Sequence, residues 1–429
     1  GNILFMTDQD LDGHHIKALC INLFQCEWPS LLKIPGFIGY MNTPIIKAKR
    51  GTQERWFYND VEYNMWKLLN EDSWKIKYYK GLGTSTGKEF REYFEKRKIV
   101  SFEHAGQETD NLIDMVFNKK RADDRKLWLS DYSRDVCLDT SKPVVSYDDF
   151  INKELIHFSK YDCDRSIPNL MDGLKISLRK ILYSAFKKGL NSEIKVAQFT
   201  GYVSEHSGYH HGEASLNGAI VGMAQNFVGS NNINLFLPNG QFGTRVQGGK
   251  DSASERYIFT QLNKITRYIF PQQDDSILKY LEDDGFPVEP VFYAPIIPMI
   301  LVNGTTGIGT GFSTDIPSYN PIQIMDYLDG KLNGKVEEYE WAPYYEGFQG
   351  TIEKVDSVSS SNMNAKYLIR GKYHKVSSTT DTICVTELPV GFWTQNFKEL
   401  LEDLIVPQED KEKSGGKKSL PIVKEYVNN

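Results

Sequence analysis

The stretch Ile3-Leu4-Phe5-Met6-Thr7-Asp8-Gln9-Asp10-Leu11-Asp12-Gly13 decides the fold class of this 429-residue chain. Its apolar residues, 3–6, predict a short buried strand, and the stretch His15–Phe24 that follows has a helical pattern. A buried strand that leads into a helix is the opening of an α/β unit, in which ligands bind at the carboxyl ends of the strands. The acidic residues therefore stand where an α/β fold places its chemistry.

Three interpretations of the acidic triplet compete. Asp8, Asp10 and Asp12 alternate, so in an extended segment at least two carboxylates can converge on one hard cation. An EF-hand loop does not fit, because Leu19 stands where its bidentate glutamate is needed and a strand precedes the acids. A solvated acidic turn is the plain alternative, although three such carboxylates repel one another. A Mg²⁺ site at a strand end suits phosphoryl chemistry.

Two glycine-rich segments invite comparison with nucleotide-binding loops, and their spacing excludes both. Three residues separate the glycines of Gly83–Lys88 where a P-loop has four, and Glu89 follows where Ser or Thr is required. Gly307–Gly311 lacks the third glycine of a dinucleotide fingerprint. Each segment is either a tight structural turn or a place where backbone approaches a ligand, and Lys80 beside the first could donate to a phosphate.

Composition limits the class of protein. Length predicts about three domains, and a composition of 40% hydrophobic and 25% charged residues with a net charge of −6 is that of an ordinary, mildly acidic protein. Five cysteines without a C-x-x-C pair fit neither a disulfide framework nor a zinc site and indicate a reducing, intracellular setting. A membrane span needs about 18 apolar residues in a row, and the sequence has none. Because no initiator Met or signal peptide opens the chain, we expect a piece of a longer protein.

Local patterns divide the rest of the chain. Trp74–Tyr79 alternates like a strand, and it leads through the glycine turn into a charged helix, Lys88–Lys98. Leu138–Val145 has the pattern of an extended linker, which predicts a domain boundary before Asp148. Helical segments broken by Gly/Asn loops follow as far as Phe270.

A second boundary is expected near Pro295–Pro298, and beyond it the chain is rich in alternating β-formers. The expected strands are Gly350–Val355, Tyr367–Ile369 and Thr382–Val385. Lys411–Lys418 has the composition of a flexible loop.

The segment from Arg165 to Phe270 is basic within an acidic chain. It holds twelve lysines and arginines and six acidic residues, a net charge of +6. A charge run is commonly a solvated face, but here the basic residues alternate with aromatic residues and Gly/Asn loops, as on a phosphate-binding surface. His206, His210 and His211 could bind phosphate or transfer protons, and no set of further ligands is spaced for zinc.

Tyr257 lies in this basic segment, directly after Arg256. The chain has 24 tyrosines, so composition alone singles out none of them. A phenol with a pKa near 10 becomes a nucleophile only where cationic donors or a metal stabilise the phenolate and the attacked phosphate. Arg256 and a histidine from elsewhere would meet that need.

Together these pieces resemble the type IIA DNA topoisomerases, specifically the eukaryotic type, cellular or from a large DNA virus. Seven motifs carry the resemblance in the family's order: 6–13, 77–86, 165–168, 209–213, 240–245, 256–259 and 307–311. The match is dense to about Ile316 and looser beyond it, where Glu387-Leu388-Pro389 still fits. In bacterial relatives the metal module and the tyrosine lie on separate chains, whereas here they share one.

The resemblance implies a multidomain α/β plus α+β fold. It places the C-terminal part of a Rossmann-like TOPRIM metal-binding domain at 1–110, a linker at 111–157, a winged-helix domain with the tyrosine at 158–296, and the start of a mixed α/β tower domain at 297–429.

The resemblance also implies residue roles. Asp8 and Asp10 would bind Mg²⁺, for which Mn²⁺ or Ca²⁺ can substitute, with Asp12 supporting them. Tyr257 would attack a DNA phosphate to form a 5′-phosphotyrosyl link. The remaining implied roles are phosphate stabilisation by Arg256, Arg165 and His211, contact with DNA by Lys80, Lys175 and Arg245, and a duplex-kinking apolar wedge at Ile308.

The implied activity is a Mg²⁺-dependent, transient double-strand break and its religation by a homodimer. In the full enzyme ATP would drive strand passage that relaxes supercoils and decatenates DNA, with the ATP site outside this chain. The expected location is the nucleus, or host cytoplasm or nucleus if viral, with no membrane association. Two alternatives remain: a TOPRIM nuclease or primase without a tyrosyl intermediate, and a DNA-binding fragment that cuts nothing.

Two departures from the family pattern stand out. The family takes a further metal-site glutamate from an earlier strand, and the present chain begins after it and ends before the expected coiled-coil gate. This chain alone is therefore expected to bind DNA without passing strands. Serine is usual in the family where His14 stands.

Overall fold

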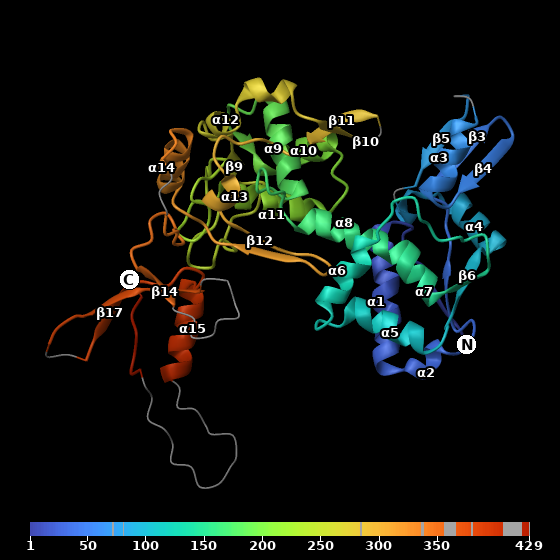
Figure 1. Cartoon of the computed structure of the whole chain (residues 1–429), viewed down its shortest axis with the longest axis horizontal. Helices are drawn as coiled ribbons and strands as arrows, with labels where there is room; N and C mark the ends of the chain where they lie inside the picture. Colours follow the sequence, from blue (N-terminus) through green and yellow to red (C-terminus); the bar gives the residue numbers. More distant parts are fainter. Residues whose placement is uncertain are drawn as a thin grey trace, which may run out of the picture. The chain divides into compact units, whose positions relative to one another are not determined.

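The computed structural model describes residues 1–70, 73–79, 81–283, 285–335, 339–355, 366–378, 381–405 and 423–428. The chain divides into two compact units: Gly1–Ile167 with Ile308–Ser313, and Pro168–Gly307 with Thr314–Asn429 (Figure 1). Each unit has a hydrophobic core of its own. The predicted loop Lys411–Lys418 lies outside the described residues.

The first unit is built on a mixed four-stranded sheet in the order β1-β2-β6-β7. The strands are β1 (Ile3–Phe5), β2 (Ile38–Met41), β6 (Ile99–Glu103) and β7 (Val144–Ser146). β1 runs parallel to β2, β2 antiparallel to β6, and β6 parallel to β7. The predicted strand at residues 3–6 and the helix after it are confirmed, the helix being α1 (Leu11–Glu27). The acidic triplet therefore occupies the turn from β1 into α1.

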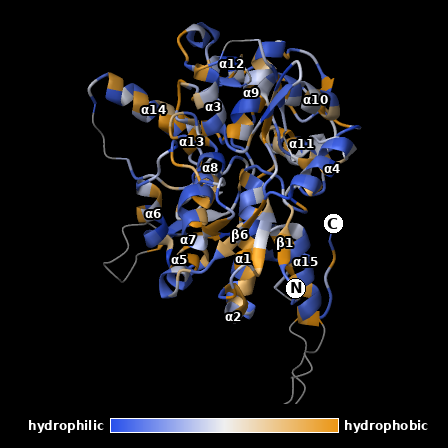
Figure 2. Ribbon diagram, turned by 90° about the vertical axis from the view of Figure 1, so that its right-hand side faces the viewer, coloured by the Kyte–Doolittle hydropathy of each residue, from blue (hydrophilic) through white to orange (hydrophobic). Residues whose placement is uncertain are grey.

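Helices complete this unit, including the stretch expected to be a linker. They are α2 (Pro29–Leu32), α5 (Gln107–Phe117), α6 (Ala122–Ser130), α7 (Tyr147–Phe150), a π-helical turn (Ile151–Leu155) and α8 (Ile156–Ser166). Ile113, Leu138 and Phe150 are buried in the core with Ala18 and Ile21 of α1. Figure 2 shows the hydrophobic residues that gather where β1, β6 and α1 meet. Residues 111–157 thus form part of the first unit instead of a linker, because their apolar side chains are needed to fill its core.

A second, three-stranded antiparallel sheet in the order β4-β3-β5 carries the glycine turn. Its strands are β3 (Ile46–Arg50), β4 (Gln53–Phe57) and β5 (Lys75–Tyr78), packed with α3 (Asp60–Leu68). The predicted strand at Trp74–Tyr79 is confirmed as β5. A 3₁₀ turn (Leu82–Thr84) then leads into α4 (Gly87–Lys96), the expected charged helix.

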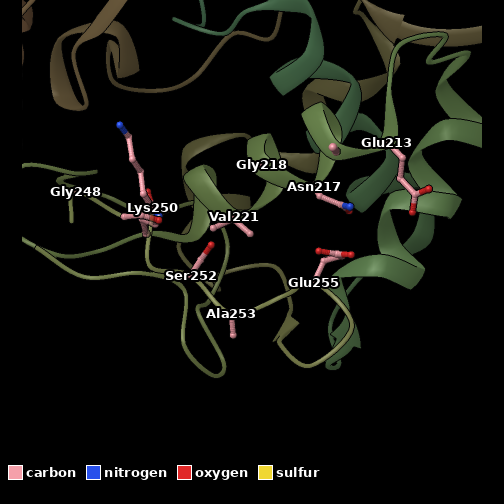
Figure 3. Close-up of a pocket in the computed structure, with 12 residues that line it drawn as sticks. Glu213, Asn217, Gly218, Val221, Gly248, Lys250, Ser252, Ala253 and Glu255 are labelled. Atoms are coloured by element: carbon pink, nitrogen blue, oxygen red, sulfur yellow. The ribbon is translucent and has the colours of Figure 1, made fainter. Parts of the chain in front are cut away.

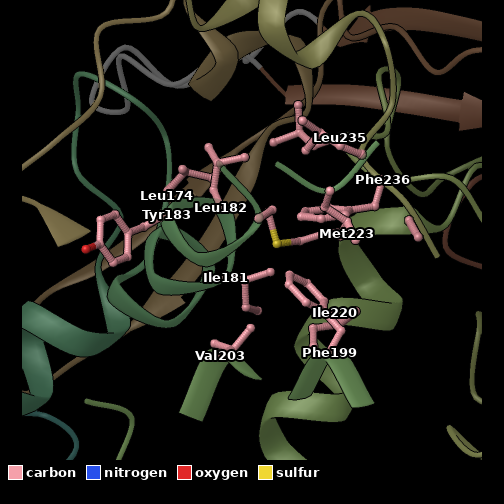
Figure 4. Packing of buried hydrophobic residues seen from close by; sticks show 14 of the residues in the cluster. Leu174, Ile181, Leu182, Tyr183, Phe199, Val203, Ile220, Met223, Leu235 and Phe236 are labelled. Atoms are coloured by element: carbon pink, nitrogen blue, oxygen red, sulfur yellow. The ribbon is translucent and has the colours of Figure 1, made fainter. Parts of the chain in front are cut away.

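The second unit is helical in its first half, as predicted. Its helices are α9 (Ile176–Lys188), α10 (Val196–Ser207), α11 (Glu213–Ala224), α12 (Thr266–Ile269), a 3₁₀ turn (Gln272–Ser276), α13 (Met299–Val302) and α14 (Pro321–Leu332). Ile181, Leu182, Phe199, Ile220 and Phe236 pack together in its core (Figure 4). Short antiparallel pairs join this bundle: β8 (Ile194–Lys195) with β9 (Phe259–Thr260), and β10 (Tyr280–Asp283) with β11 (Phe286–Pro290).

The remaining strands form hairpins. β12 (Thr305–Ile308) pairs with β13 (Ser313–Ile316), β14 (Thr351–Val355) with β15 (Lys366–Arg370), and β16 (Lys372–Lys375) with β17 (Ile383–Glu387), followed by α15 (Thr394–Ile405). The three strands predicted beyond residue 350 are confirmed as β14, β15 and β17. Among the described residues no helix has the length and apolar character needed to cross a membrane.

Candidate functional site

The acidic triplet sits at the junction of β1 and α1, where close packing fixes two of its members. Asp10 is the N-cap of α1, and its Oδ1 accepts a hydrogen bond of 2.7 Å from the Gly13 N–H. Asp8 Oδ1 accepts a hydrogen bond of 2.6 Å from the Leu82 N–H in the glycine turn. The glycine turn, remote in sequence, thus holds the first acid.

The carboxylates crowd one another and part of their charge is balanced. The pKa of Asp10 lies above its ordinary value because loss of hydration and the charges of Asp8 and Asp12 disfavour ionisation. Arg165 Nη1 lies 3.8 Å from Asp12 Oδ1. A cation would relieve the remaining repulsion, so hard carboxylate oxygens in this turn fit Mg²⁺. Among the described residues, however, no group of three or more His, Cys, Asp or Glu is assembled to hold a metal.

A buried polar cluster beneath the triplet was not predicted. Lys17 of α1 is fully buried, with its Nζ 3.8 Å from Glu154 Oε2 and 4.1 Å from the centre of the Tyr40 ring. His14 Nε2 lies 3.5 Å from Glu154 Oε1. Burial lowers the pKa of His14 to about 4, despite the opposing effect of Glu154, so this residue is neutral near pH 7. The π-helical turn projects Glu154 under α1. Each of these residues looks ordinary in isolation, which is why sequence patterns did not find them.

A cavity of about 860 Å³ adjoins this cluster in the first unit. Asp10, His14, Thr140 and Glu154 contribute to its lining. It therefore joins the candidate metal site to the buried polar groups beneath it.

Tyr257 stands in a turn of the second unit with Arg256 beside it. Its N–H donates to the Ser254 carbonyl at 2.9 Å, and its side chain is 68% exposed, enough for a large substrate to reach the phenol. The Arg256 guanidinium carbon lies 5.1 Å from the centre of the Tyr257 ring. The pairing of phenol and arginine expected from the sequence is present.

An open pocket of about 690 Å³ borders this turn (Figure 3). Helix α11 supplies Glu213 and Asn217, and the segment before the tyrosine supplies Lys250, Ser252 and Glu255. Polar groups of both kinds therefore line the approach to the phenol.

The other predicted residues are distributed over both units. Lys175 is the N-cap of α9, and no side chain caps that helix end. The His211 ring packs edge-on against Tyr209, with centroids 5.4 Å apart. Ile308, at the end of β12, is 82% exposed. Lys80 lies outside the described residues.

Arg245 is engaged within the protein. Its guanidinium forms an ion pair with the buried Glu387 carboxylate and donates to the Leu388 carbonyl oxygen at 2.5 Å. These contacts favour a role in holding its loop against residues 387–388.

Comparison with known proteins identifies the arrangement. Residues 165–418 match the family model described as DNA gyrase/topoisomerase IV, and residues 41–163 match the C-terminal associated domain of TOPRIM. This chain belongs to the type IIA DNA topoisomerases. The resemblance inferred from the seven motifs is confirmed.

Several members of the family are similar along nearly the whole chain. DNA topoisomerase 2 of Plasmodium falciparum is 50% identical over 412 residues, which cover 95% of this chain and 29% of that protein. DNA topoisomerase 2 of Arabidopsis thaliana is 51% identical over 411 residues, 94% of this chain and 28% of that protein. The chain thus spans less than a third of the length of these topoisomerases.

A solved structure is similar as well. The crystal structure of the Plasmodium falciparum topoisomerase II DNA-binding, cleavage and re-ligation domain superposes with a TM-score of 0.75 at 49% identity, covering 95% of this chain and 55% of that one. The mixed α/β architecture is therefore that of a topoisomerase II cleavage domain.

Proposed function

We propose that this chain is the DNA breakage and reunion core of a type II topoisomerase, an isomerase that changes DNA topology. The observation that carries the proposal is the near-complete match to DNA topoisomerase 2 sequences together with an exposed Tyr257 beside Arg256. In this proposal each of two copies of the chain cuts one strand of a DNA duplex.

The chemistry is a reversible transesterification. The Tyr257 phenol loses its proton and its oxygen bonds to a backbone phosphorus, while the bond from phosphorus to the 3′ oxygen breaks and that oxygen leaves as a hydroxyl. The product is a 5′-phosphotyrosyl ester, and attack by the 3′ hydroxyl reverses the step. Because the ester retains the energy of the broken bond, cleavage and resealing need no ATP. Arg256, with His211 and Arg165, would stabilise charge on the phosphate.

The acidic triplet is assigned to Mg²⁺. Asp8 and Asp10 would hold the cation, and Asp12, opposite Arg165, would support them. When bound, Mg²⁺ stabilises charge that develops on phosphate oxygens. The residues' own contribution is orientation: the Gly13 and Leu82 N–H groups fix two of the carboxylates.

DNA contacts are assigned to residues whose surroundings leave them accessible. The uncapped N-terminus of α9 beside Lys175 suits a backbone phosphate, and the exposed Ile308 suits a wedge between base pairs. Lys80 would approach the same duplex. Arg245 has the weaker support, because Glu387 and Leu388 already engage it.

The remaining assignments concern the larger protein. We propose a homodimer that binds double-stranded DNA and couples strand passage to ATP at a site outside this chain. Within the chain we propose a partial TOPRIM domain, a winged-helix domain bearing Tyr257 and part of a tower domain. The expected location is the nucleus, or the host cytoplasm or nucleus for a viral source.

A covalent trapping experiment tests the proposal. The complete gene product is incubated with supercoiled plasmid and Mg²⁺, denaturant is added, and protein attached to 5′ ends is measured. We expect attachment with the natural protein and none with Tyr257→Phe, because the variant lacks the attacking oxygen. Tyr268→Phe, at another exposed tyrosine, is the matched control and should retain attachment.

Adducts that persist in Tyr257→Phe would refute the tyrosine assignment. Cleaved DNA with free 5′ ends would instead favour a nuclease, and DNA binding without any cleavage would favour a fragment that only binds.

A further inference from the structure

The glycine turn of the first unit lies directly against Asp8. Besides the 2.6 Å hydrogen bond from the Leu82 N–H to Asp8 Oδ1, the Gly81 backbone packs on the carboxylate. Gly81 has φ +137°, and a Cβ there would lie 3.0 Å from Asp8 Oδ2. The position of this backbone therefore determines how the Asp8 carboxylate is oriented.

Glu89, in the first turn of α4, joins the two ends of that loop. From the strand side, Lys77 Nζ donates to both carboxylate oxygens at 2.9 and 2.8 Å, and the Tyr79 hydroxyl donates to Oε1 at 2.6 Å. From the helix side, the Thr86 N–H and hydroxyl donate to Oε2 at 2.8 and 2.9 Å. One carboxylate thus bridges the residues before and after the turn.

The bridge is buried and charged, unlike a surface ion pair. Glu89 is 9% exposed. Burial opposes ionisation, but the hydrogen bonds from Lys77, Thr86 and Tyr79 outweigh it and lower the pKa of Glu89 to about 2. Removing one partner of such a network leaves buried polar groups unsatisfied, so the loop would relax.

We propose that Glu89 is a positioning residue for the metal site: by joining Lys77 and Tyr79 to Thr86, it holds the Leu82 N–H against Asp8. The inference rests on the proposed role of Asp8 in binding Mg²⁺. It gives a function to the residue that disqualified this segment as a P-loop. Glu89 does not touch the cation and acts only through the backbone of the turn.

The test compares Glu89→Gln with Glu54→Gln in the complete gene product. Glutamine keeps the shape of the side chain but loses the charge and one acceptor. Glu54 is the matched control because it pairs with Lys47 and Lys49 of the same three-stranded sheet, at 2.8 and 3.1 Å, and does not contact the turn. Tyr79→Phe removes a single hydrogen bond and serves if Glu89→Gln does not fold.

Three readouts separate positioning from general stability: the Mg²⁺ concentration for half-maximal cleavage, Mn²⁺ binding followed by the EPR signal of free Mn²⁺, and hydrogen exchange of the peptide over Gly81–Thr86. For Glu89→Gln we expect metal affinity to fall about tenfold, as for other outer-shell partners, with cleavage restored by excess Mg²⁺ and faster exchange in the turn. Tyr79→Phe should shift each readout less, and Glu54→Gln should shift none.

Unchanged Mn²⁺ binding in a folded Glu89→Gln would overturn the proposal, as would a loss of cleavage that excess Mg²⁺ does not restore. Asp8→Asn distinguishes the two levels of inference. If Asp8→Asn weakens Mn²⁺ binding and Glu89→Gln does not, only the positioning role fails. If Asp8→Asn leaves Mn²⁺ binding unchanged, the metal assignment fails and the positioning role fails with it.

Discussion

At the scale of single residues, the acidic turn depends on the absence of a side chain at Gly13. A Cβ on Gly13 would lie 2.0 Å from the Asp8 carbonyl oxygen and 3.1 Å from Asp10 Oδ1. The glycine is required here by close backbone approach, because its backbone has an ordinary helical conformation. This packing brings the end of β1 onto the first turn of α1 and so places both acids.

Gly13→Ala should therefore harm both stability and metal binding. Moving backbone to accommodate the methyl group is expected to cost about 1–3 kcal/mol and to separate Asp8 from Asp10, which lowers the melting temperature and weakens Mn²⁺ binding. Gly87→Ala is the control, since nothing lies within 4 Å of a Cβ built there. Calorimetry and EPR measure the two effects, and a Gly13→Ala protein as stable as the Gly87→Ala control would contradict this account.

The sequence was sufficient to find the acids but not what holds them. Spacing alone placed Asp8, Asp10 and Asp12 at a strand end, since alternation and a following helix are local signals. Glu154 and Lys17 meet only through the fold, 137 positions apart along the chain. Glu89 had a local signal, the capping box Thr86-x-x-Glu89, but a capping box predicts a helix start and says nothing about Asp8.

At the scale of elements, the sequence predicted those with strong periodicity and missed those that depend on tertiary contacts. β1, α1, β5 and the strands beyond residue 350 were predicted. The mixed-charge stretch Asn118–Arg125 resembled a boundary, yet Arg125 Nη1 donates to the Met115 and Asn118 carbonyl oxygens and so satisfies the end of α5. Long polar side chains that cap a neighbouring helix are indistinguishable by composition from those of a linker.

The loop after Phe242 is likewise held by a distant element. Trp393 packs on Gly248, where a Cβ would lie 2.4 Å from the indole, and the Gln395 N–H donates to the Val246 carbonyl at 3.0 Å. Arg245 adds its ion pair with Glu387. The start of α15 and the residues before it therefore clamp a loop that borders the pocket near Tyr257.

This clamp predicts strong coupling between Arg245 and Glu387. Arg245→Met or Glu387→Gln alone leaves one buried group unpaired and should cost about 3 kcal/mol, whereas the double variant should be little worse than either. Melting temperatures of the four proteins give the coupling. DNA affinity separates the two roles of Arg245: additive stabilities, with weaker binding in Arg245→Met alone, would restore it as a DNA contact.

At the scale of the whole molecule, the net charge of −6 conceals an uneven distribution. The twelve basic and six acidic residues of the stretch from Arg165 to Phe270 give it a charge of +6, so the excess of acid lies elsewhere in the chain. A duplex is attracted by the local charge of the surface it meets, because physiological salt screens charges more than about 10 Å away. The overall acidity therefore does not oppose binding to DNA.

Binding of duplex DNA should accordingly depend steeply on salt and on this basic stretch. With six or more phosphate contacts, affinity is expected to fall about 10³-fold from about 50 to about 200 mM salt, measured by fluorescence anisotropy without divalent cations. Lys175→Ala should lower the slope of log K against log salt by about one contact, equally for all sequences. Lys119→Ala, an exposed lysine outside the stretch, should leave the slope unchanged. Equal slopes for the two variants would show that attraction comes from total charge and not from the basic segment, since both remove one positive charge and differ only in where it stood.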